Sequence, residues 1–277
     1  MDNLKLFKLF RIIMGFAFII MIPLLIFNYH LWNLLTKFYV ITAVIFLLYR
    51  FTAWFYAEYK PAPDYGLSDE PYSILIPVKN EEKNLFIKTI QTIVEQKGKK
   101  EILIGDDCSD NKVEDLLKKY PLLYHNVKIY RANENIGKKA MQVYLLKKAK
   151  YDLIINIDSD VVLGDNITTQ KLIAPLKNRK VGLTNGGLSI FDPRKSFLNR
   201  AQSIMYYCAN QIGRRSWGNF GINPVASGQT LAIRKSYFMP FIDEYSNKKF
   251  LGQKINFGED RLMTNIFLRE GYKSVYV

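Results

Sequence analysis

Hydrophobic and polar positions follow two alternating patterns from residue 72 onward. Short apolar runs bounded by polar turn residues predict buried strands, and apolar residues spaced by three and four positions predict amphipathic helices. Strands are predicted over residues 72–76, 101–105, 127–131, 152–157, 182–190 and 225–233, and helices over residues 82–96, 112–120 and 138–149. Because strands and helices alternate, we expect right-handed crossovers and an α/β fold in which a three-layer, mainly parallel sheet is flanked by helices.

Two long apolar stretches precede this region. Residues 12–27 contain no charged side chain, and residues 38–56 contain Arg50 alone. Each stretch is close to the roughly 20 residues that a helix needs to cross a bilayer. A cleaved signal peptide is the alternative for the first stretch, but residues 27–31 offer no small-residue cleavage site. We therefore predict that residues 1–58 form a hairpin of two N-terminal transmembrane helices.

Basic residues set the orientation expected for this hairpin. Three basic residues precede the first apolar stretch and Lys60 follows the second, whereas the short connection carries only Lys37. Since positive charge favours the cytoplasmic side, both ends of the hairpin should face the cytoplasm. The proline-containing residues 59–71 are typical of a linker, and residues 72–277 then form a cytosolic domain. We expect a multi-pass protein of the plasma or inner membrane, with the lipid bilayer as a partner.

The composition adds a strong positive charge. The 277 residues carry a formal net charge of +14, and 49% of them are hydrophobic. A basic protein suits anionic lipid headgroups, a nucleotide diphosphate or an acidic polymer. Nucleic acid is disfavoured as a partner because no nucleic-acid recognition motif accompanies the charge. Cys108 and Cys208 indicate reduced cytosolic thiols rather than a disulfide or a metal site.

Two carboxylates one residue apart follow the predicted strand at residues 152–157. Asp158 and Asp160 therefore lie at the carboxyl end of a strand, where open α/β sheets bind ligands. Hard cations such as Mn²⁺ and Mg²⁺ prefer carboxylate and phosphate oxygens. The pair is suited to hold a metal that bridges to a diphosphate, and an ordinary acidic turn is the alternative.

Other strand ends and helix starts carry candidate binding groups. Pro77 stops the first strand, and Glu81 follows it at a helix start, so both residues have a purely structural explanation as well. Asp107 lies in a carboxylate cluster after the second strand, where it could accept from uracil or ribose. Gly137 and Lys138 open a helix, where backbone N–H groups and an ammonium can meet a phosphate. A solvated basic helix start is the alternative for this last pair.

Two further positions lie near the C-terminal end of the chain. Gly228 interrupts the predicted strand at residues 225–233, which allows the close approach of a ligand or forms a β-bulge. Asp260 opens a helix that carries Leu262 and Ile266. It is either an N-cap or a general base, since a sugar hydroxyl must lose its proton as it attacks an anomeric carbon.

Taken in their order along the chain, these motifs resemble the family 2 inverting glycosyltransferases with a GT-A fold. The segments that carry the resemblance are Ile76-Pro77-Val78-Lys79-Asn80-Glu81, Asp106-Asp107-Cys108-Ser109, Gly137-Lys138-Lys139, Asp158-Ser159-Asp160 and Gly258-Glu259-Asp260-Arg261. Within that family, the two apolar stretches and Phe250-Leu251-Gly252 are most similar to membrane-embedded processive synthases of the hyaluronan and chitin type. The resemblance spans nearly the whole chain.

The resemblance implies a role for each candidate residue. The donor-binding residues that it implies are Pro77, Glu81 and Asp107 around the uridine, Lys138 near the nucleotide, and Asp158. Asp160, together with Asp158, would ligate Mn²⁺ or Mg²⁺. Asp260 would be the catalytic base, and Gly228 and Gln253 would lie at the acceptor. It also implies a UDP-sugar donor, a carbohydrate or lipid-linked acceptor, and a single displacement that inverts the anomeric centre. The donors it suggests for a growing polysaccharide are UDP-N-acetylglucosamine (UDP-GlcNAc), UDP-glucuronate (UDP-GlcA) or both.

The chain departs from the family pattern at several places. Ala226 and Gln229 stand where hyaluronan synthases tend to have cysteine and proline, which leaves the transferred sugar open. Cys108 replaces a glycine that often follows the paired aspartates, and we expect it to serve packing. The Gln-x-x-Arg-Trp signature and the C-terminal membrane helices expected after Asp260 are missing, so we expect a glycosyltransferase domain truncated at its C-terminus.

Two other functions therefore stay open. A non-processive transferase that glycosylates a lipid carrier shares the donor motifs. A truncated, non-catalytic membrane subunit could retain nucleotide-sugar binding alone. A dinucleotide-dependent oxidoreductase is disfavoured, because the first strand ends in Pro77-Val78-Lys79 and not in a Gly-x-Gly turn.

Overall fold

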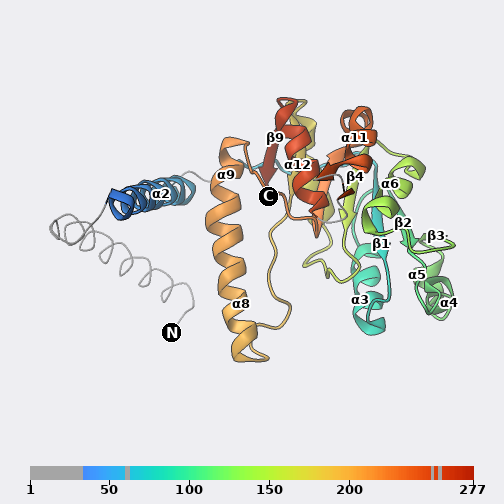
Figure 1. Ribbon diagram of the computed structural model, residues 1–277. Coiled ribbons are helices and arrows are strands. Elements are labelled where there is room, and N and C mark those ends of the chain that lie inside the picture. Colours follow the sequence, from blue (N-terminus) through green and yellow to red (C-terminus); the bar gives the residue numbers. More distant parts are fainter. Residues whose placement is uncertain (1–33, 60–62, 251–252, 255–257) are drawn as a thin grey trace. The chain divides into compact units, whose positions relative to one another are not determined.

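The computed structural model describes residues 34–59, 63–250, 253–254 and 258–277 (Figure 1). The chain divides into two compact units, Met1–Phe55 and Tyr56–Val277. The helix α2 (Leu34–Tyr59) contains the second predicted apolar span. Many of the large apolar side chains that are described on this helix are exposed, with 70% of Phe38 and 62% of Ile45 accessible to solvent.

The predicted transmembrane hairpin is not established by the structure. Its first span, residues 12–27, lies outside the described residues. Among the helices that are described, none has both the length and the hydropathy required to cross a bilayer. The hairpin stays a prediction.

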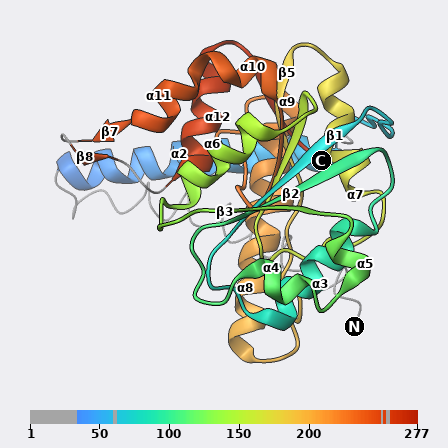
Figure 2. The same cartoon turned by 90° about the vertical axis from the view of Figure 1, so that its right-hand side faces the viewer.

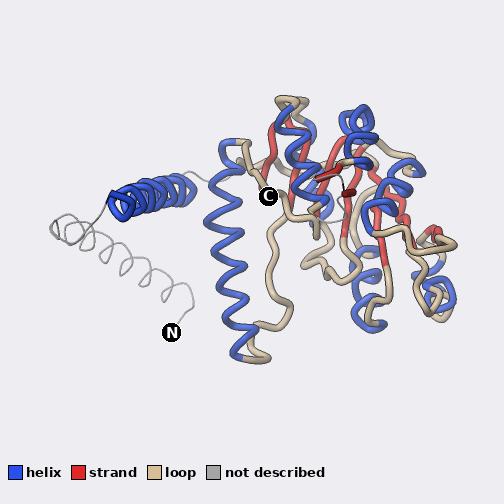
Figure 3. The backbone as a smooth tube through the Cα atoms, viewed as in Figure 1, coloured by secondary structure: helices blue, strands red, loops and turns tan. Residues whose placement is uncertain are grey.

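The unit Tyr56–Val277 is built around a seven-stranded sheet in its described residues (Figures 1 and 3). The strands are β1 (Tyr72–Val78), β2 (Lys100–Asp106), β3 (Lys128–Arg131), β4 (Leu153–Ile157), β5 (Val181–Asn185), β6 (Thr230–Arg234) and β9 (Lys273–Tyr276). Their order across the sheet is β3-β2-β1-β4-β6-β5-β9. The strands from β3 to β4 in this order are parallel, as are β5 and β9, whereas β6 is antiparallel to both of its neighbours. A separate small sheet pairs β7 (Lys249–Phe250) with β8 (Gln253–Lys254).

The C-terminal side of the sheet differs from its prediction. The strand predicted at residues 225–233 begins only at Thr230, and the strand predicted at residues 182–190 ends at Asn185. β6 is antiparallel, a property that the spacing of apolar residues does not encode. β9 was not predicted, because its four residues alternate too briefly to form a recognisable pattern.

Helices cover both faces of the sheet, which confirms the α/β prediction (Figure 2). One face packs against α3 (Lys83–Val94), α4 (Val113–Leu117) and α7 (Thr168–Ile173), and the other against α6 (Lys138–Lys148), α10 (Lys235–Phe238), α11 (Ile242–Asn247) and α12 (Glu259–Arg269). The remaining described helices are α5 (Pro121–Tyr124), α8 (Phe197–Tyr207), α9 (Arg215–Phe220), the π-helix η2 (Cys208–Arg214) and the 3-10 helices η1 (Ala174–Lys177) and η3 (Met239–Phe241). The predicted helices at residues 82–96, 112–120 and 138–149 correspond to α3, α4 and α6.

Strand β1 shows why the sheet has two buried faces. All seven of its residues are buried, so it reads as a continuous apolar run and not as an alternating one. Ile74 and Ile76 belong to the cluster that includes Phe86 of α3, whereas Leu75 belongs to the cluster that includes Met141 of α6. Successive side chains of a strand point to opposite faces, so one strand anchors both helical layers.

Close packing of α6 on β2 depends on Gly105. A Cβ atom at this position would lie 2.5 Å from Met141 Cγ and 3.0 Å from Leu145 Cδ1. We predict that Gly105→Ala lowers the free energy of unfolding by about 1–3 kcal/mol, the usual cost of overpacking a core. Chemical denaturation followed by circular dichroism measures the change. Gly164→Ala is the control, because a Cβ there meets no atom within 4 Å; equal stability of the two variants would contradict the packing argument.

Candidate active site

A cavity of about 310 Å³ opens at the carboxyl ends of β1, β2 and β4. Its lining includes every residue that the sequence assigned to the donor and the metal: Pro77, Glu81, Asp107, Lys138, Asp158 and Asp160. The carboxyl ends of these parallel strands lie at one edge of the sheet. Lys138, the first residue of α6, lines the cavity as well. We call this space the donor cavity.

The side chain of Asp107 shapes one wall of the donor cavity. It is only 3% exposed, and its two oxygens accept hydrogen bonds from the backbone N–H groups of Ile136 at 2.7 Å and Gly137 at 2.9 Å. Gly137 has a φ of 87°, a conformation that favours glycine. Asp107 therefore fixes the loop that leads into α6, a link that the sequence pattern did not reveal.

Asp106, its neighbour, holds the turn after β2. The carboxylate is 1% exposed and accepts hydrogen bonds from the N–H of Ser109 at 2.8 Å and of Val113 at 3.3 Å, and it pairs with the guanidinium of Arg131. Within this turn, Cys108 adopts a left-handed φ of 57°. That conformation explains why a glycine suits the position, and the Cys108 thiol points to the carbonyl of Asn133 at 3.7 Å.

An ion cluster centred on Lys138, the residue after Gly137, also lines the donor cavity. Lys138 Nζ is 2.8 Å from Asp158 Oδ1 and 3.1 Å from Glu259 Oε1. Burial works against the charged ammonium, but the two carboxylates outweigh burial and raise the pKa of Lys138. Burial raises the pKa of Asp158 as well; Lys138 lowers it, and repulsion from Asp160 and Glu259 adds to the rise.

The two acidic residues of the Asp158–Asp160 pair have different surroundings. Asp158 is bound to Lys138, whereas the exposed carboxylate of Asp160 forms no hydrogen bond or ion pair with the described part of the chain. Ser159 between them donates a hydrogen bond to Glu81 Oε2 at 2.7 Å. That bond ties the turn after β4 to the turn after β1.

Asp260 is held at the start of α12 by backbone groups. Its Oδ2 accepts from the N–H of Gly228 at 3.3 Å and its Oδ1 from the N–H of Arg261 at 2.8 Å. The N–H of Asp158 in turn bonds to the carbonyl of Gln229 at 3.2 Å. The segment that contains Gly228 thus connects Asp260 with the donor cavity.

Glycine at position 228 allows this close contact. A Cβ atom there would lie 3.2 Å from Asp260 Cβ, so the side chain of Asp260 packs directly on the glycine backbone. The structure therefore places Gly228 beside Asp260. Gln253, the other predicted acceptor residue, is in β8, and its side chain is outside the described residues.

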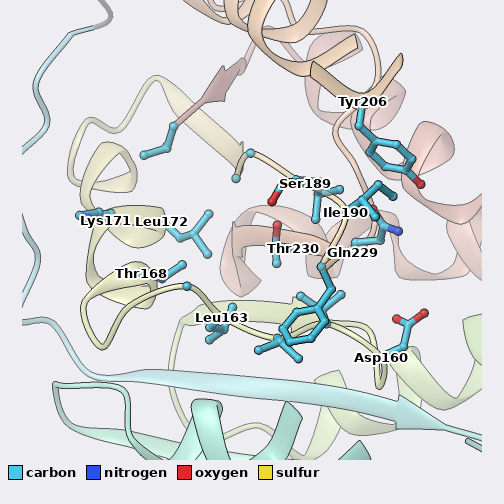
Figure 4. Close-up of a pocket in the computed structure, with 18 of the residues that line it drawn as sticks. Asp160, Leu163, Thr168, Lys171, Leu172, Ser189, Ile190, Tyr206, Gln229 and Thr230 are labelled. Carbon is cyan, nitrogen blue, oxygen red and sulfur yellow. The ribbon is translucent and has the colours of Figure 1, made fainter. Parts of the chain in front are cut away.

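A second cavity of about 700 Å³ adjoins the donor cavity at Asp160, which lines both. Figure 4 shows Tyr206, Gln229 and Asp160 toward one side of this space and Lys171 and Leu172 toward the other. It was not predicted, because its walls come from helices, a strand and loops that are distant in sequence. Glu259 was also missed; the acidic pair Glu259-Asp260 at the helix start was the available signal.

The comparison with protein families identifies the class of the chain. The family described as "Glycosyl transferase family 2" matches residues 73–240, and the chain belongs to this family. An N-acetylglucosaminyltransferase of Azorhizobium caulinodans is 30% identical over 208 residues, which cover 74% of this chain and 52% of that protein. A hyaluronan synthase of Streptococcus pyogenes is 26% identical over 281 residues, which cover 99% of this chain and 65% of that protein. The chain thus spans between about half and two thirds of the length of these two relatives.

Solved structures establish the fold as GT-A type. The mannosyltransferase PcManGT from Pyrobaculum calidifontis, in complex with GDP-Man and Mn²⁺, superposes with a TM-score of 0.60 at 19% identity over 83% of this chain and 61% of that one. GalNAc-T7 with UDP, GalNAc and Mn²⁺ gives a TM-score of 0.53 at 17% identity over 75% of this chain and 41% of that one. The predicted family and GT-A fold are confirmed.

The two hydrogen bonds accepted by Asp107 generate a prediction. In Asp107→Asn, an amide NH₂ replaces one carboxylate oxygen and faces a backbone N–H, so one buried donor loses its partner. We expect this loss to cost about 1–3 kcal/mol. Hydrogen exchange should accelerate at the amides of Ile136 and Gly137, while Asp115→Asn, an exposed change on α4, should leave both amides unchanged. Unaltered protection in Asp107→Asn would contradict the role given to this carboxylate.

Proposed function

We propose that this protein is a membrane-bound, UDP-sugar-dependent glycosyltransferase that adds sugars to a growing polysaccharide with inversion. UDP-GlcNAc, UDP-GlcA or both are the proposed donors. One observation carries the proposal: the donor cavity gathers Glu81, Asp107, Lys138, Asp158 and Asp160, and the Gly228 segment joins it to Asp260. The names of the two curated relatives support the choice of sugars.

The donor cavity has suitable groups for a nucleoside diphosphate. Lys138 supplies a positive charge at the start of an 11-residue helix, where the macrodipole also favours an anion. Pro77, near the end of β1, and Glu81, in the turn after it, line the same cavity. We assign these residues and Asp107 to the uridine side, and Lys138 and Asp158 to the diphosphate side.

The residues present fit a divalent cation. In the described part of the chain, no three Asp, Glu, His or Cys side chains gather into a metal cage. A cation that uses one or two carboxylates together with substrate phosphates needs no such cage. Asp160 is the available carboxylate, with Asp158 beside it. When bound there, Mn²⁺ or Mg²⁺ would neutralise charge on the departing diphosphate.

Asp260 is proposed as the base. The N–H groups of Gly228 and Arg261 each donate a hydrogen bond to its carboxylate and orient it. As the acceptor oxygen forms its bond to the anomeric carbon, the bond from that carbon to the diphosphate breaks, UDP leaves with the electron pair, and the hydroxyl proton passes to Asp260. The acceptor is proposed to lie by Gly228 and Gln253, and the second cavity, which Gln229 lines, provides room for a carbohydrate chain.

Membrane attachment is proposed for the N-terminal part. We retain the division into a two-helix hairpin (residues 1–58), a linker (59–71) and a cytoplasmic catalytic domain (72–277). The exposed apolar side chains of α2 and the two long apolar stretches of the sequence support this arrangement. A location in the plasma or inner membrane follows from the same proposal.

The first test addresses the base. We expect Asp260→Asn to lower kcat by about 10²–10⁴-fold, because proton transfer loses its acceptor, and to leave UDP binding within about twofold. UDP release from UDP-GlcNAc and UDP-GlcA, measured on the detergent-solubilised chain, gives kcat; calorimetry gives UDP affinity. Asp243→Asn, an exposed aspartate of α11, is the control. Full turnover by a folded Asp260→Asn variant would remove this residue as the base.

The second test addresses the metal. Mn²⁺ should strengthen UDP binding to the unchanged protein, and Asp160→Ala should abolish most of that enhancement because it removes the free carboxylate. Calorimetric titrations of UDP with Mn²⁺ and with a chelator measure the difference. An enhancement of the same size in Asp160→Ala would show that the metal ligand is assigned wrongly. Tight UDP binding with no turnover of either UDP-sugar would instead favour a non-catalytic subunit.

A further inference from the structure

Glu259 has surroundings unlike those of an ordinary helix-start glutamate. Its side chain is 17% exposed, and its Oε1 lies 3.1 Å from Lys138 Nζ. Glu270, at the other end of the same helix, is exposed and pairs with its neighbour Arg269 on the surface. Glu259 is thus largely shielded from solvent, and the ammonium of Lys138 provides the opposite charge beside it.

One ammonium therefore joins three elements of the fold. Lys138 is the first residue of α6, Asp158 follows β4, and Glu259 is the first residue of α12. Both helices lie on the same face of the sheet (Figure 2). The carboxylates of Asp158 and Glu259 repel each other, and the negative charge of Glu259 raises the pKa of Asp158. The ammonium of Lys138 between them offsets this repulsion. The ion cluster is thus a link between the donor cavity and α12.

The next residue of α12 is Asp260, the proposed base, so the link and the base share one helical turn. Of the two hydrogen bonds that the Asp260 carboxylate accepts, the one from Arg261 is local to its own helix, and the one from Gly228 is long, at 3.3 Å. The ion pair of Glu259 ties the same helical turn to another element, α6. Two restraints from different elements define the position of a side chain better than one.

We propose that Glu259 is a positioning residue, which holds the first turn of α12 in register with the donor cavity through its ion pair with Lys138. The inference rests on the proposed function, because it concerns where the base meets the donor. Glu259 needs no contact with either substrate. Its loss should lower the rate of the chemical step and leave donor binding nearly unchanged.

Two substitutions separate this role from simpler ones. Glu259→Gln removes the charge, whereas Glu259→Asp keeps the charge at the helix start but shortens the side chain by one methylene. If Glu259 acted only on the helix dipole, Glu259→Asp would behave as the unchanged protein. The positioning role predicts that both variants lower kcat by about 10- to 100-fold, the usual effect of misplacing a catalytic group by about 1 Å, with the donor KM changed by less than about threefold.

A double substitution tests the pair directly. Arginine reaches further than lysine, so Lys138→Arg combined with Glu259→Asp should recover part of the kcat that Glu259→Asp loses. Lys138→Arg alone completes the double-mutant cycle. Glu270→Gln is the matched control on the same helix, and we expect it to keep full activity. Wild-type kcat in Glu259→Asp, or a cycle in which the two changes are simply additive, would overturn the proposal.

Hydrogen exchange tests the positioning role of Glu259 independently of the proposed transferase activity. Amides of residues 262–266 should exchange faster in Glu259→Gln and Glu259→Asp than in the unchanged protein, and the double substitution should slow them again. This measurement needs no turnover. If UDP-GlcNAc and UDP-GlcA are not consumed by the unchanged protein, the proposed function fails while exchange still tests the link. If they are consumed but neither kcat nor exchange responds to Glu259, only the positioning role is overturned.

Discussion

Two adjacent buried carboxylates at the end of β2, Asp106 and Asp107, are the constraint on which the donor cavity depends. A buried carboxylate is tolerated only when hydrogen bonds or opposite charges replace its water. Asp106 obtains them from the turn that follows it and from Arg131 on β3, and Asp107 obtains them from the loop that opens α6. Satisfying these two groups fixes the loops that form the wall of the cavity, so the polar bonding of one strand end sets the shape of the site.

Charge balance organises another part of the cavity lining. Asp158, Glu259 and Lys138 come from three separate elements and share one ion cluster, whereas Asp160 remains exposed and unpaired within the described residues. The neighbouring aspartates can therefore have different tasks: one is structurally engaged, and the other is available to a cation. The segment through Gly228 and Gln229 then carries the connection from Asp158 to Asp260.

The sequence predicts what depends on local pattern and misses what depends on contacts across the fold. The continuous apolar runs of β1 and β4, buried on both faces, predicted the parallel half of the sheet and therefore the edge at which Asp107, Asp158 and Asp160 meet. The direction of β6 and the existence of β9 depend on pairing partners that no local pattern names. Glu259 was not predicted for the same reason, because its role depends on an ion pair with Lys138, which lies on another helix. The predicted roles of the individual site residues, and the hairpin before them, stay predictions.

The proposed reaction is a single inverting displacement, and the stereochemistry of the first product reports whether it occurs. UDP-GlcNAc carries the sugar in the α configuration, so one displacement must give a β linkage. Proton NMR of the product formed by the solubilised chain, read at the anomeric signal, distinguishes the two outcomes. A β-linked product is expected from attack on the face opposite the diphosphate; an α-linked product would rule out this single inverting displacement.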